Sequence, residues 1–182
     1  ENHALQENAL HQPDYVPLAE TLNNHPTVSF SNASLQYMEG NALVGNLEEY
    51  SFFILTKADE FEKFRWIYKN APLSTNQSFS ITASNNNEFA LWAQGASSAG
   101  LTQFLLPTNI NQYYLLSVSN SNLSTPKGEL FLNGELAGSL TTNTSTHTVP
   151  GFTIGRFSTS SPYYFTGEIA EIILLGRKIS EE

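Results

Sequence analysis

Two glutamates in the C-terminal part of the sequence have a residue type and spacing that could support catalysis. Glu168 and Glu171 lie within the apolar segment Tyr163 to Ser180, and a retaining glycosidase needs two carboxyl groups about 5 Å apart on one side of the sugar. Because successive side chains of a β-strand point to opposite faces, an offset of three residues predicts the two carboxyl groups on opposite faces. We therefore expect no enzyme activity from this pair, with Glu168 partly solvated and Glu171 in contact with a loop.

The candidate ligands for a metal ion are Asp59 and Glu60, with Glu62 two residues further on. Calcium takes about six to eight oxygen ligands, and these carboxylates could supply some of them at the rim of a domain. The spacing matches no EF-hand, so a solvated acidic turn is the favoured interpretation and calcium is the alternative. The four histidines lie far apart in the sequence, and no pair has the spacing of zinc ligands.

Aromatic side chains are the best candidates for a binding site, because a sugar ring can stack on Trp or Tyr while amides bond its hydroxyl groups. Trp92 follows Phe89 by three residues, which predicts that the two point to opposite faces of one strand. Trp66 and Tyr68 alternate in another strand and are expected to share a face. For each aromatic residue, a place in the core is the alternative. The full set of carbohydrate-binding candidates is Trp66, Tyr68, Asn86, Trp92, Tyr163 and Tyr164.

Composition excludes several classes of function. The 182 residues carry a formal net charge of −9, and the eight Lys and Arg are scattered along the chain. Nucleic acids and anionic membrane surfaces require clustered basic residues, so neither is an expected partner, and a glycan ligand should be neutral or weakly charged. The absence of cysteine excludes disulfides, thiolate nucleophiles and thiolate zinc sites. No Gly-x-Ser-x-Gly or P-loop motif is present, and no apolar run is long enough to span a membrane.

Short segments rich in β-forming residues, separated by turn residues, predict an all-β protein of about a dozen strands. We expect a single domain, residues 1–182, folded as a two-sheet antiparallel β-sandwich, since no helical periodicity is present. Residues 1–25 contain Pro13 and Pro17 and are expected to form an irregular arm around the domain edge. The predicted strands are Thr27–Phe30, Leu35–Met38, Tyr50–Lys57, Phe61–Lys69, Gln77–Ser84, Glu88–Gln94, Leu101–Leu106, Asn111–Asn120, the two arms of Lys127–Leu140, Phe152–Gly155 and a last strand within Tyr163–Ser180.

Three of these segments carry more specific expectations. Asn133-Gly134 predicts a two-residue hairpin turn with positive φ at both positions. The Ser/Thr-rich segment Leu140–Pro150 is expected to be a loop. The last strand is the most apolar segment of the chain, so we expect it in the middle of a sheet with both faces covered.

Three segments resemble the laminin-G-like and concanavalin A-like lectin jelly rolls, namely KGELFLNGELAG, FTIGR and FTGEIAEIILLGRKIS. Gly167 and Glu171 match the glycine and the acid of that family's closing strand. The resemblance implies a two-sheet jelly roll that is a module of a secreted or surface protein, binds glycans or proteins, and in some members holds calcium. Glucanases on this fold carry further acids two and four residues after the first acid of a strand motif. The corresponding residues here are Ala170 and Ile172, so the resemblance does not extend to catalysis.

The resulting hypothesis is a non-catalytic carbohydrate-binding or adhesion module, located outside the cell or at the cell surface and flanked by other domains. Its partner would be a glycan or a surface protein, and calcium is the one cofactor to test. Two alternatives stay open. One is a structural or protein-interaction spacer without a sugar site, and the other is a polysaccharide-cleaving enzyme on the same fold.

Overall fold

The structure is a computed structural model that describes residues 4–47, 49–61, 65–70, 79–84, 88–94, 101–121, 128–140, 147–157 and 163–179. Two short 3-10 helices, η1 (Ala9–His11) and η2 (Glu20–Leu22), lie near the start of the described part. All other regular elements in the described residues are β-strands. The strands are β1 (Asp14–Ala19), β2 (His25–Phe30), β3 (Met38–Leu47), β4 (Glu49–Ala58), β5 (Arg65–Asn70), β6 (Phe79–Ser84), β7 (Glu88–Gln94), β8 (Leu101–Pro107), β9 (Tyr113–Ser121), β10 (Gly128–Leu132), β11 (Glu135–Leu140), β12 (His147–Ile154) and β13 (Gly167–Leu175).

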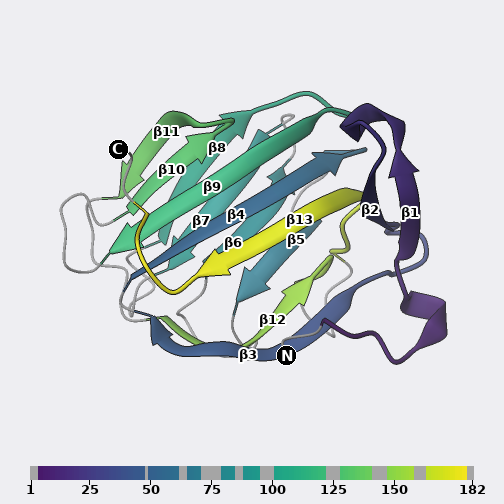
Figure 1. Ribbon diagram of the computed structural model, residues 1–182, viewed down its shortest axis with the longest axis horizontal. Coiled ribbons are helices and arrows are strands. Elements are labelled where there is room, and N and C mark those ends of the chain that lie inside the picture. Colours follow the sequence, from purple (N-terminus) through teal and green to yellow (C-terminus); the bar gives the residue numbers. More distant parts are fainter. Residues whose placement is uncertain are drawn as a thin grey trace.

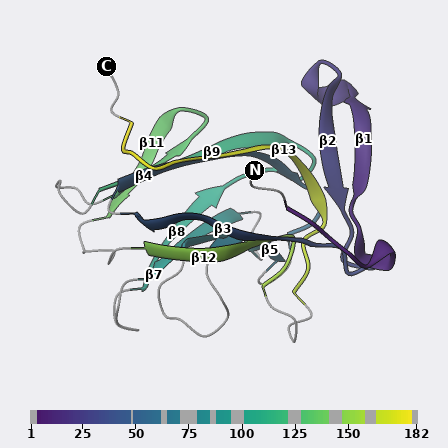
Figure 2. The same cartoon turned by 60° about the horizontal axis from the view of Figure 1, so that its bottom comes forward.

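The strands form two antiparallel sheets packed face to face, which confirms the predicted β-sandwich. The first sheet has seven strands in the order β1-β2-β13-β4-β9-β10-β11, and the second has six in the order β3-β12-β5-β6-β7-β8. Figure 1 shows the seven-stranded sheet in front of the six-stranded one, and Figure 2 shows the two layers nearly edge-on. No helix in the described part of the chain is long and apolar enough to cross a membrane.

The core lies between the two sheets and follows from the alternation of apolar residues along each strand. On β4, Tyr50, Phe52 and Ile54 are at most 3% exposed and point inward, and the residues between them point outward. From the other sheet, Ile81 and Phe89 are 1% exposed and meet them in the core cluster. The inner positions of these strands therefore form the core between the two sheets.

The closing strand β13 lies between β2 and β4, in the middle of its sheet as predicted. Gly167 begins it with φ +154, and a Cβ atom there would collide with the backbone oxygen of Lys57, so only glycine allows the approach to β4. The expected cover on both faces is wrong, because Ile173 is 38% exposed and Glu171 is exposed on the outer face. The strand is central within its sheet, but one side of that sheet faces solvent.

The N-terminal prediction of an irregular arm over residues 1–25 is wrong for residues 14–19, whereas the described residues 4–13 form no strand. Residues 14–19 form β1, which pairs with β2, and this hairpin extends beyond the end of the sandwich (Figure 2). Pro17 is compatible with β1 because the strand lies at the sheet edge. The backbone N–H that proline lacks is not needed for pairing on the outer side of an edge strand.

Two further strand predictions failed in the six-stranded sheet. In the segment Leu35–Met38, Leu35 ends a turn and Gln36 and Tyr37 lie outside any strand; the strand begins at Met38 and continues to Leu47. The predicted loop Leu140–Pro150 includes the first half of β12. Pro150 fits there because the register of β12 against β3 shifts around it, and Pro is tolerated at such bulges.

Candidate functional site

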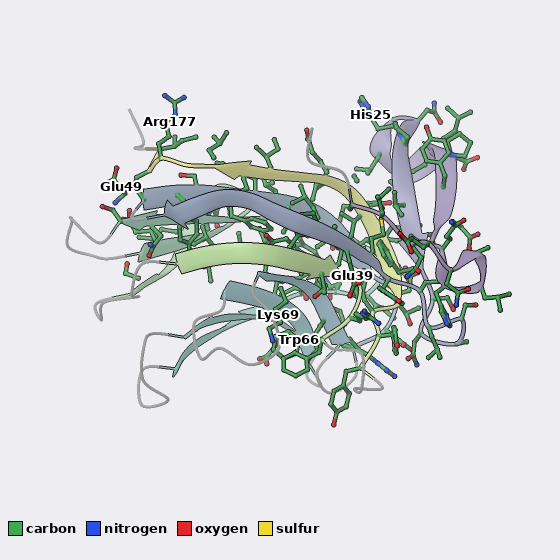
Figure 3. The ribbon with its side chains drawn as sticks, turned by 90° about the horizontal axis from the view of Figure 1, so that it is seen from below. His25, Glu39, Glu49, Trp66, Lys69 and Arg177 are labelled. Carbon is green, nitrogen blue, oxygen red and sulfur yellow. The ribbon has the colours of Figure 1, made fainter. Side chains whose placement is uncertain are left out.

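A β-bulge in β5 creates an aromatic and basic patch on the outer face of the six-stranded sheet. Trp66 pairs with Thr82 and Tyr68 with Ile81, so Ile67 is the extra residue and the alternation of faces is reset. As a result, Trp66 and Lys69 both reach Phe157, with a ring-centroid separation of 4.5 Å for Trp66 and 3.9 Å from the Lys69 Nζ atom to the ring centroid. We call Trp66, Phe157 and Lys69 the Trp66 patch. Figure 3 shows Trp66 and Lys69 beside each other, on the side facing away from β13.

The chain before β13 supports this patch from one side. Tyr164 forms isolated bridges with both Trp66 and Arg156 and is 8% exposed. Its neighbour Tyr163 is 39% exposed. The structure thus brings together three of the predicted binding residues, with Trp66 partly exposed, Tyr163 exposed and Tyr164 buried.

An arginine anchors the same corner of the sandwich. The Arg156 guanidinium lies 3.3 Å from the Tyr37 ring centroid and forms an ion pair with Glu39. The Tyr37 ring in turn lies 6.3 Å from the ring of Tyr164. Because Arg156 is 4% exposed and Glu39 balances its charge, it acts as a structural support for Tyr37 and, through Tyr37, for Tyr164.

A register row leads from this corner across the six-stranded sheet. Glu39 on β3 pairs with Thr153 on β12, Thr153 pairs with Lys69 on β5, and Lys69 pairs with Ser80 on β6. Ser80 pairs with Trp92 on β7. The backbone therefore places Trp92 in the same row as Lys69, while its side chain and all of Asn86 lie outside the described residues, and their binding roles stay predictions.

Tyr68 does not belong to the site that the sequence suggested. It is 1% exposed, and its ring lies 4.5 Å from that of Phe52 and stacks with that of Phe152 at 6.2 Å. Burial raises the pKa of its phenol. The prediction that Tyr68 shares a face with Trp66 is wrong because the bulge at Ile67 turns Tyr68 into the core.

The two glutamates of the possible catalytic pair share one face, contrary to the prediction from their spacing. Ile169 pairs with Thr56 and Glu171 with Leu55, so Ala170 is a bulge residue and both glutamates point outward. The carboxylate of Glu168 is fully engaged, however. Lys57 donates to its Oε1 atom at 2.6 Å, and Thr27 donates to its Oε2 atom at 2.7 Å.

The electrostatics of Glu168 also differ from those of a general acid. Burial alone would raise its pKa, but hydrogen bonds from Lys57, Tyr113 and Thr27 outweigh burial and lower the pKa. A general acid needs a raised pKa so that it holds a proton near neutral pH. Glu168 is therefore a structural carboxylate that stays ionised at neutral pH.

The possible calcium ligands Asp59 and Glu60 each face a basic side chain. Lys57 Nζ lies 3.4 Å from Asp59 Oδ1, and Arg65 Nε lies 3.7 Å from Glu60 Oε1, which also accepts a hydrogen bond from Thr166. Among the described residues, no three His, Asp or Glu side chains gather closely enough to hold a metal ion. These local cations offset the carboxylate charge that a calcium ion would otherwise balance.

A hollow of about 450 Å³ lies on the outer face of the seven-stranded sheet. Phe53 and Phe131 form part of its lining, together with Glu129, Lys178 and Ile179. Its polar groups are largely engaged with one another. Lys178 and Glu129 form an ion pair at 3.1 Å, and the backbone of Ile179 is bonded by serine hydroxyls of β4 and β9.

Sequence reasoning missed Phe157 and Lys69 as members of the site. Both follow from the bulge at Ile67 and from the way residues 155–157 approach β5, where the Gly155 amide donates to the Ile67 carbonyl at 2.9 Å. The one available signal was the unusual proximity of two basic residues to Trp66 in the segment Arg65–Lys69.

Comparison with known proteins identifies the fold. No family model matches the chain, and no curated protein sequence matches it. Among solved structures, domain 4 of AbnA, an extracellular arabinanase from Geobacillus stearothermophilus in complex with arabinotriose, aligns with a TM-score of 0.73 and 15% identity over 99% of this chain and 83% of that one. A SAP-like pentraxin from Limulus polyphemus aligns with a TM-score of 0.61 and 12% identity over 79% of this chain and 71% of that one.

A third similar structure is the binding domain of botulinum neurotoxin DC in complex with SialylT. It aligns with a TM-score of 0.65 and 8% identity over 99% of this chain and 43% of that one. All three neighbours contain lectin-like β-sandwiches. The fold of this chain is a jelly-roll sandwich. The expected fold is thereby confirmed at this level, while the narrower likeness to laminin G domains stays a prediction.

Proposed function

We propose that this chain is a non-catalytic carbohydrate-binding module that holds an oligosaccharide against the Trp66 patch. The observation that carries the proposal is the partly exposed indole of Trp66, fixed on Phe157 at 4.5 Å on the outer face of a sheet. An aromatic ring in such a position offers its face to the C–H groups of a sugar ring. Tyr163, at 39% exposure, offers a second aromatic surface close by.

The structural neighbours support the same class of ligand. Domain 4 of AbnA is described in complex with arabinotriose. A further similar structure, of botulinum neurotoxin type C with a TM-score of 0.63, is described with cell entry that depends on two ganglioside molecules. Their sequence identities of 15% and 10% carry the fold alone, so the ligand class is our proposal for this chain. We further propose that the module belongs to a larger secreted or cell-surface protein of the laminin-G-like type, flanked by other domains.

The non-catalytic part of the proposal rests on Glu168. Its carboxylate accepts bonds from Lys57, Thr27 and Tyr113 and has a lowered pKa, which suits neither a general acid nor a free nucleophile. An assay of reducing ends released from a panel of polysaccharides tests this directly. Sustained release of reducing sugar that is lost in Glu168→Gln would replace the module with an enzyme.

A structural or protein-interaction spacer is the second candidate function. The hollow between Phe53 and Phe131 favours it, because apolar surface of this kind is often covered by a neighbouring domain. A broad glycan array, probed with and without calcium, separates the two functions. Binding to a defined group of glycans supports the module, and a calcium requirement would add the one cofactor in question. Failure to bind any glycan under both conditions would favour the spacer.

A further inference from the structure

The Trp66 patch contains a lysine whose charge is not balanced locally. Lys69 is 4% exposed, although lysine side chains are almost never this deeply buried unless they are paired. Among the residues that the structure describes, its only polar or ring contact is the Phe157 ring, 3.9 Å from Nζ. The described ion pairs involve Lys57, Arg65, Arg156 and Lys178, and Lys69 is in none of them.

The carboxylate that shares a register row with Lys69 already forms an ion pair with another residue. Glu39 lies two strands away in the same register row, with Thr153 between it and Lys69, and it forms an ion pair with Arg156. The segments 71–78 and 158–162, which follow β5 and Phe157 in the chain, contain no Asp or Glu, and the segment 62–64 before β5 contains one, Glu62. Among the described residues, no carboxylate pairs with the Lys69 ammonium group, which lies beside the aromatic surface of the patch.

The Lys69 ammonium group is not fully enclosed, because Lys69 Nζ is not among the fully buried side-chain atoms without a hydrogen-bond partner in the described part of the chain. The stem of Lys69 is therefore enclosed while its tip keeps an opening, which is the usual way for lysine to lie on an apolar surface. Desolvation lowers the pKa of Lys69, as expected for an ammonium group that lacks a counter-charge.

We propose that the Trp66 patch selects oligosaccharides that carry a carboxylate, with Lys69 as the residue that binds the carboxylate. The proposal rests on the proposed function, and it departs from the neutral ligand expected from the net charge of −9. Net charge acts over the whole surface and is screened beyond about 8 Å at physiological salt. An ammonium group in direct contact with a carboxylate is screened far less, so Lys69 decides the local preference.

The test compares acidic sugars with matched neutral ones by titration calorimetry. The probes are trigalacturonate with its methyl ester, and 3′-sialyllactose with lactose, so that uronates are distinguished from sialic acids. We expect at least one acidic probe to bind roughly tenfold more tightly than its neutral partner, the size expected for a bond to a charged group. The difference should shrink as salt is raised.

Three variants assign the preference to Lys69. Lys69→Met keeps the length of the stem and should lose the preference while retaining the affinity for the neutral partner. Lys69→Arg keeps the charge and should retain the preference. Lys178→Met, on the outer face of the other sheet, is the matched control and should behave like the parent. Because Lys69→Met removes a buried unpaired charge, it should fold at least as stably as the parent, which a thermal melt checks.

The outcomes separate this inference from the function on which it rests. Equal affinity for acidic and neutral partners, or an unchanged preference in Lys69→Met, overturns the role of Lys69 and leaves the carbohydrate-binding module standing. Binding of neutral glycans alone on a broad array has the same consequence. If the chain binds no glycan at all, the proposed function fails and this inference fails with it.

Discussion

At the residue scale, Phe157 is the centre of the candidate site, because Trp66 contacts it at 4.5 Å and Lys69 at 3.9 Å. The two neighbours differ in what they can offer. The indole of Trp66 supplies a stacking face, and the Lys69 ammonium supplies charge. Phe157 holds both in place, so the site is preorganised before any ligand arrives.

The first prediction concerns Trp66. Trp66→Ala should weaken glycan binding by about tenfold or more, since tryptophan anchors commonly carry a large share of a binding energy. Leu115→Ala is the matched control, because Leu115 is 37% exposed on the outer face of the other sheet. Affinity is measured by titration calorimetry after a thermal melt shows that both variants are folded. Unchanged affinity in a folded Trp66→Ala variant would place the site elsewhere.

The second prediction concerns Glu168. Its lowered pKa means that the folded chain binds a proton there less readily than the unfolded chain does. Its contribution to stability is therefore complete above the unfolded pKa of about 4.5 and is lost as pH falls through the lower folded value. Glu168→Gln should reduce the free energy of unfolding at pH 7 by about 1–3 kcal/mol.

Urea unfolding at several pH values checks this. The difference between parent and Glu168→Gln should be largest near neutral pH and should narrow on acidification below pH 4 or so. A difference that stays constant down to pH 2 or so would show that the Lys57–Glu168 contact contributes no charge-dependent stability.

At the element scale, the β10–β11 hairpin shows a turn that the sequence alone could define. Asn133 and Gly134 have φ values of 53° and 85°, as the Asn-Gly pair predicted. The Asn133 side chain also accepts a hydrogen bond from the Leu115 amide at 3.0 Å, and the Asn133 amide donates to the Leu115 carbonyl at 2.8 Å. The turn is thereby fixed to β9 as well as to its own strands.

The third prediction tests this turn. Gly134→Val should destabilise the protein by about 1 kcal/mol or more, because a β-branched residue rarely adopts positive φ. A Cβ atom at Gly134 would meet nothing within 4 Å, so the loss should come from the backbone and not from a clash. Gly134→Asn, which tolerates this conformation, should lose less. Equal melting temperatures for both variants and the parent would contradict the turn geometry.

The sequence could predict strands with strong local signals. The expected bounds of β7 are those observed, and β4 extends the prediction by one residue at each end. The missed strands lack such signals. The strand β3 contains two glycines and two asparagines and exists because it pairs with β12 along most of its length. The edge strand β1 contains Pro17, and proline is rare in strands, so the local sequence argues against a strand there.

The candidate site could be predicted only in part, because two bulges decide it. Regular alternation along the strand predicted that Tyr68 shares a face with Trp66. Because Ile67 is an extra residue in β5, Lys69 lies on the face of Trp66 instead, and Tyr68 points into the core. The extra residue Ala170 likewise moved Glu168 and Glu171 onto one face. A bulge depends on pairing between strands that are distant in sequence, and no local pattern in either segment reveals it.

At the scale of the whole molecule, the two sheets present different outer faces. The described C-terminal residues cross the outside of the seven-stranded sheet, where the Ser51 hydroxyl donates to the Arg177 carbonyl at 3.0 Å. The Trp66 patch lies on the opposite layer (Figure 3). A ligand on the patch and a neighbouring domain on the seven-stranded sheet could therefore bind at the same time.

We infer that glycans bind the outer face of the six-stranded sheet. The most direct test is a two-dimensional NMR titration of the labelled protein with the best glycan from the array. We predict that the shifted amide signals cluster at residues 65–69 and 153–157 and at Tyr163. Shifts centred on Phe53, Ser117 and Phe131 would contradict binding at the Trp66 patch and assign it to the hollow on the seven-stranded sheet.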